Sequence, residues 1–156
     1  MKKALLIICC MFISSVLVGQ STGKLPTSFD PSRNAEKDVK AALEEAKTAG
    51  KRVLLDVGGS WCSWCKRLDA FIEENSEIKN LMASNFVTVK INFSPENKNE
   101  AFLSKYPKVD GYPHFFVLES DGKLLHSQNT GELEQDLSYS KDKMLAFIKK
   151  WAPKKN

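Results

Sequence analysis

Three short strand-like runs, separated by segments of helical periodicity, constrain the fold of this chain more than any other feature. The runs cover residues 53–57, 86–93 and 114–118, and the first is apolar except for Asp56. A continuous apolar run is typical of a strand buried on both faces, whereas 86–93 alternates apolar and polar side chains. Because strands that are linked through helices favour parallel pairing, the sequence predicts an α/β domain.

Helices are predicted between the strands and on either side of them. Asp121-Gly122 is a hairpin signal, so residues 123–126 should pair antiparallel with 114–118. We therefore expect a mixed, four-stranded central sheet flanked by helices, with room for a fifth strand at an edge. Residues 127–139 are polar and give no assignment. The predicted helices cover 35–49 with Gly50 as C-cap, about 62–74, one or two turns from Asn75 or Ser76, 97–105, and a last helix capped by Ser140 and ended by Pro153.

The N-terminus has the three-part layout of a secretory signal peptide. Lys2 and Lys3 precede an uncharged apolar stretch over 4–18, and small or polar residues follow. The apolar stretch is shorter than the roughly 20 residues that a spanning helix needs, so a cleaved signal over 1–20 is favoured over an anchor. The protein is thus expected to be exported, periplasmic or secreted; an uncleaved segment would tether it to the outer face of a membrane.

Beyond the signal, the pattern predicts one folded domain over 35–153, preceded by a linker or loosely held N-terminal arm over 21–34 that contains two prolines. The net charge of +4 is small, and the Lys and Arg residues are scattered. Nucleic-acid binding would require a concentrated basic stripe, so that class is disfavoured. We expect a monomer.

After removal of the signal, the chain keeps two cysteines, Cys62 and Cys65. A structural disulfide gains most by closing a long loop, and this pair closes a very short one, so the pair is expected to be reactive. Cys62 would lie at the start of a helix, where free backbone N–H groups and the helix dipole favour a thiolate. Cys62 is therefore predicted to form a mixed disulfide with a substrate, and Cys65 to resolve it.

Two other interpretations of the cysteine pair remain open. It could be half of a zinc site, but the remaining ligands would be His114 and His126, whose spacing does not fit a zinc motif. It could also be an inert disulfide, which the helix N-terminal setting disfavours. No metal site is therefore expected.

Asp56 is the second residue of chemical interest. A carboxyl group inside an apolar strand is costly unless it has a partner or a task, and burial would raise its pKa. It could accept the proton of Cys65 when that thiol attacks, or it could be an ordinary strand-end residue bonded to nearby backbone. Lys90, in the next predicted strand, could pair with it or could simply be exposed.

Taken together, these segments resemble the thioredoxin superfamily. The resemblance covers about 35–152 and depends on the 53–56 strand, Trp61-Cys62-x-x-Cys65-Lys66, and Gly111-Tyr112-Pro113 before the third strand. It implies a thioredoxin fold and a cis-proline at Pro113 facing the dithiol. It also implies that Asp56 and Lys90 are the family's buried acid and its lysine partner. Substrate-binding residues would be Trp61, Trp64 and Tyr112.

The chain departs from the family pattern at three places. Ser63-Trp64 lies between the cysteines with no His, and this absence favours a reductant or an electron relay over an oxidant. Gly58 and Gly59 replace bulkier residues, so a more open surface is expected there. The stretch 128–139 is longer than the expected connection and is either a partner-binding or, as we favour, a solvated loop.

We therefore expect an extracytoplasmic thiol–disulfide oxidoreductase that reduces or exchanges disulfides in exported proteins. No metal or organic cofactor is expected. The partners would be disulfide-containing exported proteins and a membrane-linked electron donor. The alternatives are a disulfide oxidase or isomerase, a non-catalytic thioredoxin-like binding module, and a metal- or haem-delivery protein.

Overall fold

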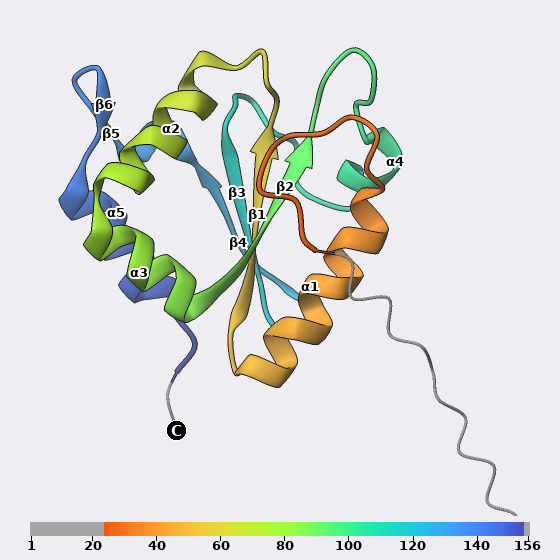
Figure 1. The fold of residues 1–156 in the computed structure, drawn as a ribbon, viewed down its shortest axis with the longest axis horizontal. Coiled ribbons are helices and arrows are strands. Elements are labelled where there is room, and N and C mark those ends of the chain that lie inside the picture. The colour runs from red at the N-terminus through yellow and green to blue at the C-terminus, as the bar shows by residue number, and fades with distance from the viewer. Residues whose placement is uncertain (1–23, 155–156) are drawn as a thin grey trace, which may run out of the picture.

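The computed structural model describes residues 24–154, which form a central sheet with helices on both faces (Figure 1). The strands are β1 (Arg52–Gly58), β2 (Phe86–Asn92), β3 (His114–Leu118) and β4 (Leu124–Asn129). Their order in the sheet is β2-β1-β3-β4. Strand β2 runs parallel to β1, while β3 is antiparallel to both β1 and β4. The predicted mixed four-stranded sheet is thus confirmed.

Two apolar layers hold the helices against the sheet. Side chains alternate along a strand, so Val53 and Leu55 of β1 face one layer and Leu54 faces the other. Figure 1 shows α1 and α4 on the first face and α2, α3 and α5 on the second. The helices are α1 (Ala35–Ala49), α2 (Ser63–Glu74), α3 (Ser76–Asn85), α4 (Glu100–Leu103) and α5 (Lys141–Trp151).

The helix boundaries that cap chemistry predicted are largely confirmed. Gly50 ends α1 in the left-handed conformation, with φ of 65°. Ser140 caps α5, and its side chain accepts a hydrogen bond from the backbone N–H of Lys143. These local signals therefore define where two long amphipathic helices begin or end.

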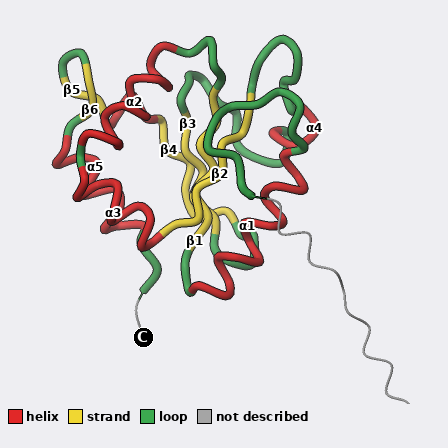
Figure 2. The backbone as a smooth tube through the Cα atoms, viewed as in Figure 1, coloured by secondary structure: helices red, strands yellow, loops and turns green. Residues whose placement is uncertain are grey.

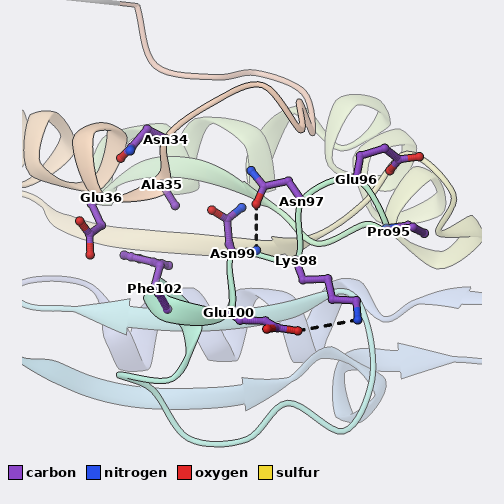
Figure 3. A pocket seen from close by; sticks show the side chains of 11 residues that line it. Asn34, Ala35, Glu36, Pro95, Glu96, Asn97, Lys98, Asn99, Glu100 and Phe102 are labelled. Atoms are coloured by element: carbon purple, nitrogen blue, oxygen red, sulfur yellow. Dashed lines mark hydrogen bonds and ion pairs between the residues drawn. The ribbon is translucent and has the colours of Figure 1, made fainter.

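The predicted helix over 97–105 is shorter in the structure. Asn99 adopts a left-handed conformation with φ of 48°, and its backbone N–H donates to Oδ1 of Asn97 at 3.0 Å. Such side-chain bonds to the backbone compete with helical hydrogen bonding, so α4 begins only at Glu100. These residues line a polar cavity of about 560 Å³, in which Lys98 pairs with Glu100 (Figure 3). Neither Cys62 nor Cys65 lines it.

The stretch 127–139, left unassigned, is structured. After β4, a 3-10 turn at Thr130–Leu133 leads into a hairpin of β5 (Glu134–Gln135) and β6 (Ser138–Tyr139) (Figure 2). Leu133 and Tyr139 are buried in the layer beneath α2, so the stretch is anchored to the domain, whereas its tip at 135–137 is exposed as expected of a solvated loop. Within residues 24–154, β5 and β6 form their own two-stranded sheet and add no fifth strand to the central one.

The described part of the N-terminal arm, 24–34, is packed rather than loosely held. Leu25 lies against the apolar layer beneath α1. Arg33 pairs with Asp38 at 2.5 Å and donates to the carbonyl of Lys24 at 3.3 Å. These contacts connect both ends of the arm to the domain.

The predicted signal peptide over 1–20, which includes Cys9 and Cys10, lies outside the described residues, as do 21–23 of the arm. From Lys24 to Lys154, no helix combines the length and apolar character that crossing a bilayer requires.

Candidate active site

Cys62 and Cys65 are joined by a disulfide at the N-terminus of α2. β1 ends at Gly58, and the chain then turns so that the N–H of Cys62 donates to the carbonyl of Gly59 at 3.0 Å. Cys62 is the N-cap of α2, and its sulfur accepts a hydrogen bond from the N–H of Cys65 at 3.0 Å. The helix N-terminus therefore stabilises negative charge on the Cys62 sulfur when the bond is opened.

Gly58 and Gly59 are packed against their neighbours, which overturns the expectation of an open surface. A Cβ on Gly58 would overlap the sulfur of Cys65, and a Cβ on Gly59 would overlap the indole of Trp61. These positions are glycine because the end of β1 lies too close to the disulfide and the tryptophan to accept a side chain.

A Gly58→Ala variant should be less stable, because its Cβ would lie 2.9 Å from the ring of Phe29 as well as against Cys65. Overpacking of this kind costs about 1–3 kcal/mol. Urea unfolding of the oxidised protein measures the difference. Gly111→Ala is the matched control, since its Cβ would meet nothing within 4 Å. Equal stabilities of the two variants would contradict the tight packing at Gly58.

Asp56 is buried on β1, and its Oδ2 accepts a hydrogen bond from Nζ of Lys90 at 2.6 Å. The two residues are register partners in β1 and β2, so of the two alternatives for Lys90 the pairing with Asp56 is the one observed. The other carboxylate oxygen of Asp56, Oδ1, has no hydrogen-bond partner among the described residues. Burial raises the pKa of Asp56 above its ordinary value and outweighs the opposing effect of Lys90.

Asp69 of α2 joins this pair by binding the same ammonium group of Lys90. Burial alone would lower the pKa of Lys90, but Asp56 and Asp69 together outweigh burial and raise it. The ammonium therefore stays charged. Sequence reasoning missed Asp69, although it lies four residues after Cys65 and so on the same face of the helix.

An aromatic cluster forms the surface beside the turn that carries Cys62. The indole N–H of Trp61 donates to the carbonyl of Phe93 at 2.7 Å, and Trp61 is 55% exposed. Tyr112 stacks on Phe93 with ring centroids 4.7 Å apart and meets Trp61 edge-on at 5.9 Å. The structure thus brings Trp61 and Tyr112 together, through a phenylalanine that sequence reasoning did not select.

Pro113 lies at the same end of the sheet as the disulfide. It directly precedes His114, which pairs with Val57 near the end of β1. The Tyr112–Pro113 peptide bond is cis, in agreement with what the family resemblance implied. The carbonyl of Pro113 accepts a hydrogen bond from the hydroxyl of Thr130, so the 3-10 turn is attached to this segment.

Trp64, between the cysteines, contacts the β5–β6 hairpin. Its ring meets that of Tyr139 edge-on at 5.7 Å, and the guanidinium of Arg67 lies 4.4 Å from its centroid. Burial raises the pKa of Tyr139, so its hydroxyl stays neutral. Trp64 is therefore a packed residue as well as a candidate substrate contact.

The two histidines considered as zinc ligands are engaged in the β3–β4 pair. Nε2 of His114 lies 2.8 Å from the hydroxyl of Ser127, and Nε2 of His126 lies 3.0 Å from Oε1 of Gln128. Burial lowers the pKa of His114, which favours its neutral form. Both imidazole rings thus form hydrogen bonds with side chains of β4.

Comparison with known proteins places this geometry in a family. The model of the thioredoxin-like family matches residues 34–120. Among solved structures, a disulphide isomerase from Xylella fastidiosa Temecula1 superposes with a TM-score of 0.68 and 33% identity, covering 81% of this chain and 95% of that one. The oxidised C-terminal domain of DsbD from Neisseria meningitidis gives 0.53 and 26%, covering 80% and 97%.

Among curated proteins, the disulfide bond reductase DsbH of Chlamydia pneumoniae is 31% identical over 93 residues, which are 54% of this chain and 55% of that protein. DsbD of Actinobacillus pleuropneumoniae is 30% identical over 97 residues, 60% of this chain and 16% of that protein. The chain thus spans about half the length of the first relative and a small part of the second. The chain belongs to the thioredoxin-like family.

Proposed function

We propose that this domain reduces or exchanges disulfide bonds in exported proteins, with Cys62 as nucleophile and Cys65 as resolving thiol. The observation that carries the proposal is the disulfide at the N-terminus of α2, with a buried acid on the adjacent strand β1. The similarity to DsbH, whose name describes a disulfide bond reductase, supports reduction as the direction.

The reaction begins with both cysteines reduced. The Cys62 thiolate attacks one sulfur of the substrate disulfide, that bond breaks, and one substrate thiolate leaves. Cys65 then loses its proton and attacks the sulfur of Cys62, which releases the second substrate thiolate and forms the Cys62–Cys65 disulfide. Two electrons pass to the substrate, and the substrate thiolates take up protons from the medium and from the site.

Asp56 is proposed to accept the proton of Cys65 in the second step. A carboxylate can do so only when ionised, and burial in this site holds its pKa above the ordinary value. Lys90 stabilises the ionised form through its hydrogen bond to Oδ2. The resolving step should therefore become faster as the pH rises through the pKa of Asp56.

The substrate is proposed to lie against Trp61, Trp64, Tyr112 and Pro113, which surround the disulfide end of the sheet. An exposed Trp61 beside a stacked Tyr112 offers apolar area for an extended protein segment. Working as a reductant outside the cytoplasm also requires a source of electrons. The similarity to DsbD, a thiol:disulfide interchange protein, supports a redox partner protein as that source. We propose that this donor is membrane-linked and that the domain works outside the cytoplasm, as the predicted signal peptide over 1–20 implies.

A disulfide isomerase is the second candidate function, because a solved structure described as one is 33% identical and covers most of both chains. An isomerase and a reductase use the same two cysteines. They differ in the reduction potential of the dithiol/disulfide couple, which is lower in a reductase than in an isomerase.

We expect the Cys62–Cys65 couple to have a reduction potential below about −220 mV, toward the reducing end of the known range. Ser63-Trp64 places no cation between the cysteines to stabilise the reduced thiolate. Equilibration of the mature domain with glutathione and dithiothreitol buffers measures the potential. A value above about −180 mV, at or beyond that of disulfide isomerases, would replace the reductase by an isomerase or oxidase.

A further inference from the structure

The N-terminal arm carries one aromatic residue, Phe29, to the edge of the dithiol site. Leu25 is packed in the apolar layer on one side of it. On the other side, the amide of Asn97 donates to the carbonyl of Pro31 at 2.8 Å, and Arg33 is paired with Asp38. Phe29 is therefore held between anchored segments. Figure 1 shows the arm passing beside β2, the strand at the edge of the sheet.

The ring of Phe29 contacts two parts of the site at once. Nζ of Lys90 lies 4.5 Å from the ring centroid, a cation–π distance. At Gly58, the space that a Cβ would occupy lies 2.9 Å from the ring and against the sulfur of Cys65. The ring thus fills the position between the end of β1, the disulfide and the ammonium that binds Asp56.

A groove of about 840 Å³ runs along the described part of the arm toward the Asp56–Lys90 ion pair. Arm residues 24–27, helices α2 and α3, and strand β2 line it, and it reaches Asp56, Asp69 and Lys90. The charged or titratable groups that face Asp56 or line this groove are Lys24, Glu45, Lys51, Asp69, Glu73, Lys79, Lys90 and Tyr139.

We propose that Phe29 is a positioning residue of the dithiol site, whose ring excludes water from the side of Lys90 that it covers and from the Gly58 side of Cys65. Asp56 then exchanges its proton with solvent through the groove and keeps Lys90 as its ionic partner. This inference depends on the proposed function, because it concerns the proton that Cys65 gives up. The arm is accordingly part of the catalytic unit, although it lies outside the helix–strand framework.

Removing the ring should admit water to Lys90 and to the neighbourhood of Asp56 from a second side, in addition to the groove. Better solvation stabilises the ionised carboxylate, so Asp56 would ionise at a lower pH. Because Cys65 needs an ionised Asp56, the resolving step would then accelerate at a lower pH than in the native protein. A ring that served only packing would leave this midpoint unchanged.

The test is a stopped-flow titration of the Cys65 step in Phe29→Ala. The reduced protein is mixed with an aromatic disulfide whose released thiolate absorbs visible light, so attack by Cys62 and resolution by Cys65 give successive phases. We expect the midpoint of the second phase to fall by about half a pH unit or more, since the ring covers one side of the group. Phe29→Leu, which keeps apolar cover, should restore most of the native midpoint.

Two further variants show where the effect originates. Phe102→Ala removes a ring of the apolar layer beneath α1, where it packs on Tyr106, and it should leave the midpoint unchanged. In the Asp56→Asn background, Phe29→Ala should cause no additional shift, because the group it acts on is gone.

The outcomes separate this inference from the function beneath it. If the native protein shows no second phase, the proposed function itself is wrong. The role of Phe29 alone is overturned if the native second phase is present and Phe29→Ala has the same midpoint. It is also overturned if the shift is equally large in Phe102→Ala or in the Asp56→Asn background.

Circular dichroism of each reduced variant verifies folding. If Phe29→Ala does not fold, Phe29→Leu is used in its place. A Phe29→Leu midpoint at or above the native value would then overturn the inference, and a downward shift smaller than that expected for Phe29→Ala would support it.

Discussion

Replacing Cys62 with serine should abolish reduction of a protein disulfide, with a loss of roughly a thousandfold or more. The serine hydroxyl is not ionised at neutral pH and cannot form the mixed disulfide that the first step requires. The helix N-terminus would still be present, since Cys62 precedes the first helical residue and serine is itself a good N-cap. Turnover with a model disulfide protein and excess dithiothreitol measures the loss.

Cys65→Ser is the informative partner of this variant. Cys62 would still attack, but the mixed disulfide would not be resolved from within the protein. Mass spectrometry should therefore show a covalent adduct of the Cys65→Ser variant with substrate and no adduct of Cys62→Ser. A Cys62→Ser protein that keeps its full function would instead indicate a binding module that holds clients without turnover.

Asp56→Asn should slow the Cys65 step by roughly a hundredfold or more and leave the Cys62 step nearly unchanged. The amide cannot accept the proton, and the pH dependence that Asp56 contributes to the second phase should disappear. Lys90 would keep Asp69 as its partner, so the ammonium is not left alone. The same two-phase stopped-flow assay measures both steps, and an equal slowing of the two would contradict a role for Asp56 in resolution.

The same substitution should change how stability depends on pH. The folded pKa of Asp56 lies above its ordinary value of 3.8, so the native state binds this proton more tightly than the unfolded chain does. The contribution of Asp56 to the free energy of unfolding is therefore fully present below its ordinary pKa, and it is lost as the pH rises through the raised pKa of the folded state. Asp56→Asn should remove this decline in urea unfolding measured from acid to mildly alkaline pH, whereas the exposed-site control Asp142→Asn should retain it.

The helix–strand framework and the dithiol could be predicted from sequence because both depend on neighbouring residues. Alternating or continuous apolar runs specified three of the four strands, and the Asp121-Gly122 turn specified the fourth. Gly50 and Ser140 marked helix ends through their own backbone and side-chain chemistry. The position of Cys62 at a helix N-terminus followed from the same local pattern. The pairing of Asp56 with Lys90 was anticipated because the two occupy neighbouring predicted strands.

Contacts between segments distant in sequence could not be predicted in this way. Residues 127–139 read as polar, yet Leu133 and Tyr139 anchor them beneath α2, where Tyr139 contacts Trp64. Asp69 of α2 reaches Lys90 of β2 only because folding brings these two residues, 21 positions apart in the chain, together. The pattern of residues along the chain does not show which distant segments come into contact in the folded domain.

The sequence by itself determined the order of helices and strands, the mixed sheet and the place of the Cys62–Cys65 pair, because hydrophobic periodicity and capping act over a few residues. Only the tertiary structure decided that the arm is packed, that Gly58 is glycine for lack of space, and that Phe29 lies between Lys90 and the end of β1. These features depend on packing across the sheet edge, where the free energy of burial is shared by residues far apart along the chain.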